Sequence, residues 1–193
     1  RDQRGAAPRL CGRDTGTRCR KGRKRAGHDG LTRKLGTTKE ARGKWLIGYD
    51  DIYSIQYFGE NLRPYWNAAG DHTIVDEFRA AHEEYDELIG RCCAFDRELM
   101  TRATEAGGRK YAELCALAYR QSFAAHKLVK GPDGELRFFS KENNSNGSIG
   151  TVDITYPSAP MYLLYNPELA KGMMNHIFDY SESGRWTKPF PAH

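Results

Sequence analysis

The sequence has no long apolar run. None of its segments approaches the roughly 18 apolar residues that a membrane-spanning helix needs, so no membrane contact is expected. Its five cysteines contain no Cys-x-x-Cys pair and no spacing typical of metal ligands. They are interpreted as free, buried thiols, and neither a metal nor a cofactor is predicted. The first residues carry no basic-then-apolar secretory signal, so this end of the chain predicts no localisation.

Residues 1–43 contain no Ile, Val, Phe, Met, Tyr or Trp. They hold 14 Lys and Arg against 4 Asp and Glu, a balance of +10, whereas residues 44–193 have a balance of −5. A charged, glycine-rich segment of this kind buries too little apolar surface to offset its chain entropy. We therefore expect residues 1–34 to be disordered, or mistranslated from a GC-rich gene. A basic arm would need aromatic context to recognise nucleic acid, so no specific nucleic-acid partner is expected.

Large apolar side chains begin at residue 45. The stretch "KWLIGYDDIYSIQYFGENLRPYW" is rich in β-branched and aromatic residues, which predicts a strand or extended segment ending in a turn at Gly59. A long amphipathic helix is predicted over residues 73–103, with a break near Gly90. Thr73 and Asp76 have the spacing of a capping box at its start.

The sequence predicts that this helix ends at Gly107–Gly108 and that a second helix follows over residues 109–129. The second helix is apolar or small on nearly every side, so it should be mostly buried. An amphipathic helix followed by a buried one predicts an αα-hairpin.

Beyond residue 129 the pattern changes twice. "KGPDGELRFFSKEN" predicts a turn, a short extended piece and a loop, and "YPSAPMYLLY" is compatible with a short helix. A further helix should begin with Asn166 as its cap and Pro167 in its first turn, and fray near residues 181–184.

Three stretches of the chain resemble the glutaminase A family. They are "YDDIYSIQYFGENLRPYWN", "LCALAYRQSFAAHKLV" and the segment from "FFSKENNSNG" to "KPFPAH". The resemblance covers about Leu35 to His193. It implies a mainly α fold, namely an incomplete (α/α)6 six-hairpin barrel that holds the first two or so hairpins, with a short extended segment before it and the disordered basic N-terminus.

The resemblance also implies a domain organisation. Residues 35–70 would be an extended linker from a missing β domain, and residues 71–193 the first part of the six-hairpin domain, with residues 1–34 outside both. The missing β domain and the remaining hairpins of the same parent chain would be its structural partners, and a secreted or periplasmic location would follow.

The activity that the resemblance implies is hydrolysis of L-glutamine to L-glutamate and ammonia, absent from this fragment by itself. The six-hairpin barrel also houses glycoside hydrolases, in which two carboxylates flank the scissile bond. The small-molecule substrate is therefore expected to be glutamine, with a glycan as the alternative.

Two acids are predicted to be catalytic, Asp153 and Glu142. Asp153 lies in "TVDITYP", where burial among Val, Ile and Tyr would favour the protonated acid. A capping or turn acid for the following helix is the alternative for Asp153. Glu142 adjoins Lys141, and its alternative is a surface pair.

The predicted substrate-binding residues are polar side chains in connecting segments or in unusual helical positions. Arg120 lies in an apolar helix and would need a carboxylate partner, whereas Glu182 lies where its charge opposes the helix dipole. Gly150 would let the backbone approach a ligand, while His126 and His176 are interpreted as packing or surface residues. The set is Asp50, Asp51, Asn144, Asn146, Arg120, Glu182 and His193.

Overall fold

The computed structural model describes residues 17–19, 31–33, 37, 40, 43–142 and 146–192 of the chain. The chain divides into two compact units, residues 1–45 and 46–193. In the first unit, β1 (Thr17–Cys19) pairs with the antiparallel strand β2 (Leu31–Arg33). These two short strands are the part of residues 1–34 that the structure describes, and the expectation that this segment is disordered or mistranslated stays a prediction. The rest of that segment lies outside the described residues.

The second unit opens with a β-hairpin made of β3 (Ile55–Tyr57) and β4 (Glu60–Leu62). Phe58 and Gly59 form its two-residue loop, both with positive φ (50° and 98°), as a type I′ turn requires. The predicted turn at Gly59 is confirmed. The predicted strand or extended segment before the turn is confirmed as β3, whereas residues 45–54 form no strand and much of that stretch is exposed, with Ile47 94% accessible.

A short 3-10 helix, η1 (Tyr65–Asn67), leads to α1 (Ile74–Glu83) and α2 (Tyr85–Gly107). The capping box is confirmed, because Thr73 and Asp76 exchange side chain-to-backbone hydrogen bonds. The predicted break near Gly90 is wrong. The interruption falls at Glu84, whose ψ of 3° departs from helical geometry, whereas Gly90 lies inside the continuous helix α2.

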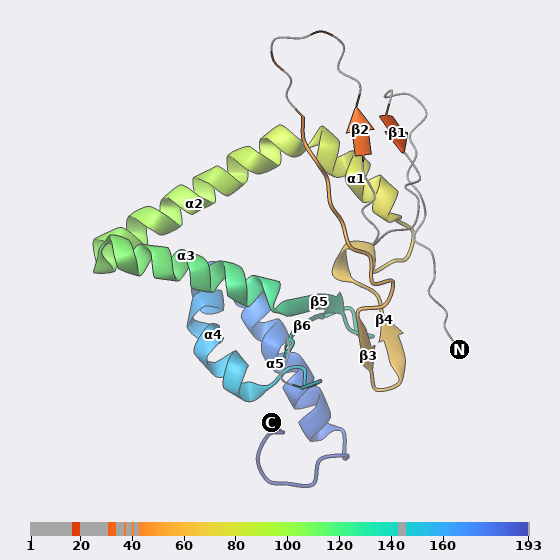
Figure 1. The fold of residues 1–193 in the computed structure, drawn as a ribbon. Helices are drawn as coiled ribbons and strands as arrows, with labels where there is room; N and C mark the ends of the chain where they lie inside the picture. The colour runs from red at the N-terminus through yellow and green to blue at the C-terminus, as the bar shows by residue number, and fades with distance from the viewer. Residues whose placement is uncertain are drawn as a thin grey trace. The chain divides into compact units, whose positions relative to one another are not determined.

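Helix α3 (Arg109–Ala124) turns back from α2 at Gly108, whose φ of 80° suits glycine. The two helices pack together and form the predicted αα-hairpin (Figure 1). The prediction that α3 is mostly buried is wrong, because Ala112 is buried while Leu114 and Leu117 are exposed. Within the described residues, other segments pack against only part of the surface of α3.

The predicted helical end at residue 129 is also wrong, because β5 (His126–Lys130) begins two residues after α3 stops. His126 Nδ1 hydrogen-bonds the carbonyl oxygen of Ser122 at 2.6 Å, which satisfies a carbonyl in the last turn of α3. The chain then forms an antiparallel hairpin with β6 (Leu136–Ser140). The extended piece predicted in this region is confirmed as β6.

The β5–β6 hairpin carries two hydrophobic cores because neighbouring strand residues point to opposite faces. Phe138 packs with Tyr162, Leu169 and Met173 in one core. Phe139, the next residue, packs in the other core with members of the β3–β4 and β5 strands: Ile55, Leu62 and Val129.

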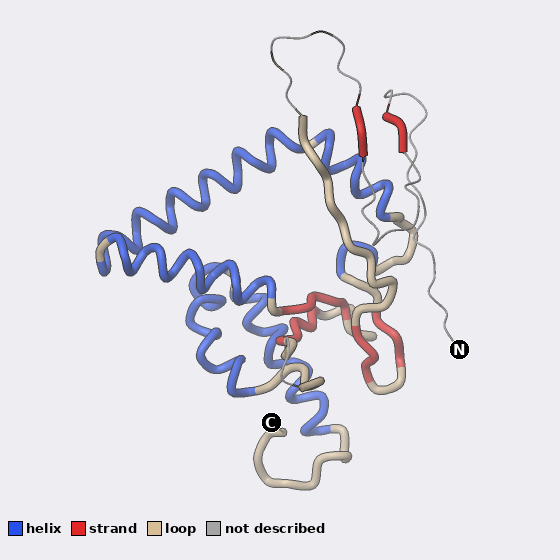
Figure 2. The backbone as a smooth tube through the Cα atoms, in the orientation of Figure 1, coloured by secondary structure: helices blue, strands red, loops and turns tan. Residues whose placement is uncertain are grey.

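The last two helices are α4 (Val152–Tyr165) and α5 (Pro167–Glu182). The start of α5 is confirmed, since Asn166 accepts a hydrogen bond from the N–H of Leu169 and Pro167 occupies the first turn. Helix α4 begins earlier than predicted and contains Pro157 and Pro160. The second unit is thus mainly helical, with the β3–β4 hairpin before its helices and the β5–β6 hairpin between α3 and α4 (Figure 2).

Helix α5 lies along the outer edge of β6. A Cβ atom on Gly172 would stand 3.4 Å from the backbone of Leu136 and of Phe138, so glycine allows the close approach. Asn175 Nδ2 donates to the carbonyl oxygen of Leu136 at 3.2 Å. The helix therefore supplies hydrogen-bond partners that a neighbouring strand would otherwise supply.

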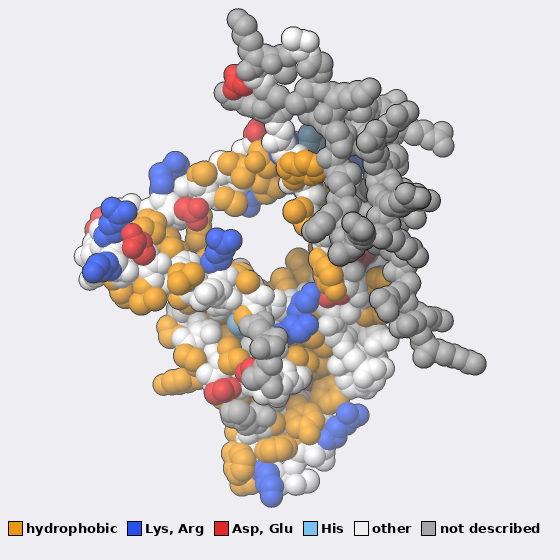
Figure 3. Space-filling model, in the orientation of Figure 1, with side chains coloured by type: hydrophobic (Ala, Val, Ile, Leu, Met, Phe, Trp, Pro, Cys, Tyr) orange, Lys and Arg blue, Asp and Glu red, His pale blue; other side chains and the backbone are white. Residues whose placement is uncertain are grey.

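Apolar side chains also lie at the surface of the helices (Figure 3). Leu163 and Leu164 of α4 are both more than 60% exposed. No helix in the described part of the chain has the length and apolar character needed to cross a membrane.

Candidate functional site

A cavity of about 380 Å³ lies where the β3–β4 loop, β6, α5 and the segment after α5 meet. Its wall is mostly aromatic and aliphatic, and its side chains with polar atoms are those of Tyr57, His176, Tyr180 and Arg185. No carboxylate lines it among the described residues. The lining residues are Tyr57, Phe58, Phe139, Ile149, Gly150, His176, Ile177, Tyr180, Arg185 and Ala192.

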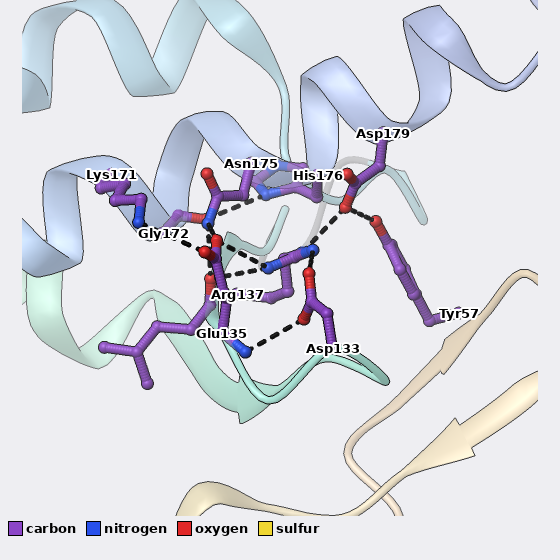
Figure 4. Close-up of polar contacts among 10 residues, drawn as sticks. Tyr57, Asp133, Glu135, Arg137, Lys171, Gly172, Asn175, His176 and Asp179 are labelled. Carbon is purple, nitrogen blue, oxygen red and sulfur yellow. Dashed lines mark hydrogen bonds and ion pairs between the residues drawn. The ribbon is translucent and has the colours of Figure 1, made fainter.

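A buried arginine anchors the elements around this cavity (Figure 4). Arg137 of β6 is only 3% exposed, and its Nε donates to Asp179 of α5 at 2.8 Å. Its Nη2 donates to Asp133, in the β5–β6 turn, at 2.6 Å. Two carboxylates thus neutralise a guanidinium that would be costly to bury alone.

Tyr57 joins this network from β3. Its hydroxyl donates to the same Asp179 oxygen that accepts from Arg137. Burial raises the pKa of Tyr57, and the hydrogen bond to Asp179 raises it further, although Arg137 acts in the opposite direction. Tyr57 therefore stays protonated at neutral pH, and its ring forms a fixed part of the cavity wall.

His176 is 7% exposed, and its ring lies 4.4 Å from that of Phe139. Its Nδ1 lies 3.3 Å from the carbonyl oxygen of Gly172, while its Nε2 is buried without a hydrogen-bond partner. Burial lowers the pKa of His176 despite the opposing effect of nearby carbonyl groups, so the imidazole is neutral at pH 7. Because a carbonyl oxygen only accepts, the contact with Gly172 favours the tautomer with the proton on Nδ1.

The backbone of Gly150 lies against the His176 ring. A Cβ atom at this position would stand 2.2 Å from His176 Nε2, so no other residue fits without displacement. Gly150 also has a φ of 67°, and its N–H donates to the carbonyl oxygen of Ser140 at 2.8 Å. The predicted close approach of this glycine is thus made to a histidine of the cavity wall.

Arg185 is the cation of the cavity. Its guanidinium carbon lies 4.8 Å from the centre of the Phe58 ring, which is a cation–π distance. The backbone N–H of Arg185 donates to Ser183 Oγ at 3.2 Å. Throughout 43–142 and 146–192, no carboxylate is within ion-pair distance of it.

Asp153 does not have the setting that its sequence neighbours predicted. It is exposed and lies in the first turn of α4, so the expectation of a sheltered acid is wrong. Val152 and Ile154 direct their side chains elsewhere because residues of a helix fan out at about 100° each. A negative charge in a first turn is favourable to the helix dipole. Its catalytic role stays a prediction.

Glu142 and Asn146 lie on either side of residues 143–145, which are outside the described residues. Glu142 is half-buried, and its N–H donates to the carbonyl oxygen of Ser148 at 3.1 Å. Asn146 Oδ1 accepts from the N–H of Ser148 at 2.8 Å, which is a local turn interaction. Neither side chain lines the cavity, and their proposed roles stay predictions.

Asp50 and Asp51, the two adjacent acids before β3, make different contacts. Asp50 is exposed, and its Oδ1 accepts from the N–H of Ile52 at 2.8 Å, which is a local turn interaction. Asp51 accepts hydrogen bonds from Ser54 and from Lys127 of β5. Burial raises the pKa of Asp51, but these hydrogen bonds outweigh it and the net pKa is lowered.

Arg120 and Glu182 also lie away from the cavity. Arg120 is exposed on α3 and lines a groove between α2 and α3 that also includes Asp96. Glu182 is exposed at the last position of α5, where water screens its charge. Asn144 and His193 lie outside the described residues.

The structure thus brings together residues that sequence reasoning did not select. Of the lining residues, only Gly150 was assigned a role near a ligand, and His176 was interpreted as packing. The sequence offered one signal for each member of the Arg137–Asp179 pair. Arg137 is a charged residue within the apolar stretch "LRFFS", and Asp179 is a charged residue within an apolar helix. No local pattern marks Tyr57 or Arg185.

Two family models match the chain; the first ends inside α2 and the second begins at the turn between α2 and α3. A domain of unknown function, DUF5127, matches residues 10–102. The glutaminase A six helical-hairpin domain matches residues 108–193. The first match begins inside residues 1–34, which the sequence resemblance had left out.

Two curated relatives carry the glutaminase name. Glutaminase A of Aspergillus oryzae is 29% identical over 168 residues, which cover 84% of this chain and 24% of the relative. The chain is thus similar to members of the glutaminase A family. A "probable glutaminase" of Arthroderma benhamiae is 28% identical over 99 residues, covering 51% of this chain and 11% of that relative. The chain thus spans a quarter or less of these relatives, and no solved structure matches it.

Proposed function

We propose that this chain belongs to the glutaminase A family and is part of an enzyme that hydrolyses L-glutamine to L-glutamate and ammonia. The similarity to glutaminase A of Aspergillus oryzae carries the proposal, since it extends over most of this chain. Amide hydrolysis also needs an attacking group, a proton donor for ammonia and donors for the oxyanion.

The cavity would serve as part of the substrate-binding site and not as the complete catalytic centre. It provides a guanidinium, a buried imidazole and aromatic walls. Because no carboxylate lines it among the described residues, the 193-residue chain by itself would not turn over glutamine. The remaining groups would come from further hairpins of an (α/α)6 barrel and from a β domain in the same parent chain.

Glycan hydrolysis has less support from the described residues. A glycosidase needs two carboxylates that face each other across the scissile bond. Asp153 and Glu182, two of the acids considered for that role, are both exposed and line no described cavity. The names of the curated relatives therefore support the amide over the glycoside as substrate.

The test is ammonia release from L-glutamine by the longest protein that carries this chain. Reducing-sugar release from a panel of glycans is measured in parallel, and the 193-residue chain is assayed beside the longer protein. We expect ammonia from the longer protein only. Reducing sugar without ammonia would contradict the proposal, and so would ammonia from neither protein.

A further inference from the structure

Helices α2 and α3 enclose a groove that carries two opposite charges. The helices diverge from their turn at Gly108 (Figure 1), and a groove of about 660 Å³ lies between them. Asp96 lines it from α2 and Arg120 lines it from α3, and both residues are exposed. Among the described residues, neither charge has an ion-pair partner. The groove therefore presents an anion and a cation that are free to pair with another surface.

The floor of the groove is made of large apolar side chains. Phe95 and Leu99 contribute from α2, and Leu117, Tyr119 and Phe123 contribute from α3. Leu117 is 51% exposed, so covering it with another apolar surface would be favourable. An exposed apolar surface bordered by polar groups is typical of a protein–protein contact.

The two charges lie at the same level of the hairpin. Counted along each helix from the turn at Gly107 and Gly108, Asp96 is about 17 Å away and Arg120 about 18 Å away. A two-fold axis parallel to the hairpin places α2 of each copy opposite α3 of the other. Asp96 of one copy then faces Arg120 of the other, and the same pair forms again across the axis. The groove is therefore complementary in charge to a second copy of itself.

We propose that this chain forms a symmetric dimer through the α2–α3 groove. Leu117 of each copy packs against the apolar floor of the other, and Asp96 pairs with Arg120 across the interface. Opposite charges in an interface mainly determine which partner and which register are allowed, so this pair specifies the symmetric arrangement. The inference does not rest on the proposed function, because the contact involves no substrate.

The size of the hairpin face predicts a weak dimer. Helix α3 has 16 residues and is about 24 Å long, and two adjacent helices are about 20 Å wide. This face would bury about 500 Å² on each copy, which is near the lower limit for a specific interface. We therefore expect a dissociation constant on the order of 10 µM.

The experiment measures association by sedimentation velocity over a micromolar concentration series. A reducing agent is present throughout, because Cys92 and Cys93 are exposed and would form intermolecular disulfides on oxidation. Two charge reversals, Asp96→Arg and Arg120→Asp, each place like charges across the interface. Arg97→Asp is the matched control, because Arg97 is an exposed residue of α2 that lines none of the described cavities.

We expect each charge reversal to weaken dimerisation at least about tenfold, whereas Arg97→Asp should dimerise like the wild type. An equimolar mixture of Asp96→Arg and Arg120→Asp should dimerise again, because one variant then presents two cations to the two anions of the other. A loss of folding in either variant could not produce this rescue. The mixture therefore separates a contact between two copies from a structural effect within one copy.

The apolar floor is tested at Leu117. Leu117→Gln should weaken the dimer about tenfold, because an apolar contact is lost on both sides of the axis. Leu114→Gln is the matched control, since Leu114 is an exposed leucine of the same helix that lines none of the described cavities. It should leave the dissociation constant unchanged.

Three results would overturn the inference. They are a wild-type chain that stays monomeric throughout the series, a dimer that neither charge reversal weakens, and reversed variants whose mixture does not dimerise. A monomeric wild type would leave the groove to another segment of the parent chain or to a different protein. Equal losses in Leu117→Gln and Leu114→Gln would place the contact outside the groove and would also overturn the inference.

Discussion

The hydroxyl of Tyr57 on β3 donates a hydrogen bond to the carboxylate of Asp179 on α5, although 122 residues separate them in the sequence. The same carboxylate accepts from Arg137 of β6. One acid therefore holds a strand of the first hairpin, a strand of the second hairpin and the last helix. The stability of the second unit should depend strongly on this cluster.

Replacing Arg137 by Met should destabilise the chain by about 3 kcal/mol, because removing one member of a buried ion pair leaves its partners uncompensated. Urea unfolding followed by circular dichroism measures the loss. Arg102→Met is the matched control, since Arg102 forms an exposed pair with Glu98 that should contribute less than about 1 kcal/mol. Equal losses in the two variants would mean that the buried network is not stabilising.

Replacing Gly150 by Ala should cost about 2 kcal/mol or more, because positive φ disfavours alanine and the new Cβ would collide with His176. Two controls separate these causes in thermal unfolding. Gly134→Ala has a φ of 80° but no neighbour, and Gly147→Ala has neither a positive φ nor a neighbour within 4 Å. A loss at Gly150 no larger than that at Gly134 would show that the collision is relieved.

Replacing Gly172 by Ala should weaken the contact between α5 and β6 by about 1–2 kcal/mol, because the Cβ would lie 3.3 Å from that of Phe138 in a packed region. Gly90→Ala provides the opposite case within an exposed helix. No atom lies within 4 Å of the added methyl group, so alanine should stabilise α2 by about 0.5–1 kcal/mol. If both variants changed the free energy of unfolding in the same direction, the close packing of α5 on β6 would be contradicted.

Acid should destabilise the chain through two histidines. Burial lowers the pKa of both His126 and His176, and near His176 the charge of Arg137 lowers it further while that of Asp179 opposes the shift. The unfolded state therefore binds protons first as the pH falls below about 6.5. The histidines leave stability unchanged above that pH and reduce it progressively below, down through their folded pKa values.

Urea midpoints measured between pH 8 and pH 5 would detect this loss, and the double variant His126→Gln, His176→Gln should show a flatter profile over that window. The lowered pKa values of Asp51 and Asp133 act in a different window. Their stabilising contribution is complete above about pH 4 and is lost as the pH falls further. An unchanged midpoint from pH 8 to pH 5 would contradict the histidine prediction.

Features that depend on neighbouring residues could be predicted from the sequence. The capping box at Thr73, the reversal at Gly108 and the start of α5 at Asn166 each follow from a few adjacent residues. The end of α3 could not be predicted, because residues 126–130 are helix-compatible alone. They become a strand by pairing with residues 136–140.

The candidate site illustrates the same distinction. "TVDITYP" suggested a sheltered acid, yet helical geometry exposes Asp153 while burying Thr155 two positions later. Tyr57, His176 and Arg185 come from a strand, a helix and a C-terminal segment. Only tertiary packing brings them to one cavity, so no spacing along the chain could reveal the set.

The placement of α5 along β6 has a consequence for self-association. An open strand edge offers unpaired peptide groups to another polypeptide and can template fibril growth. On β6, the Asn175 amide already engages the Leu136 carbonyl, and the backbone of Gly172 leaves no room for an incoming strand. Copies of this chain therefore cannot add to one another through that strand unless the last helix first detaches.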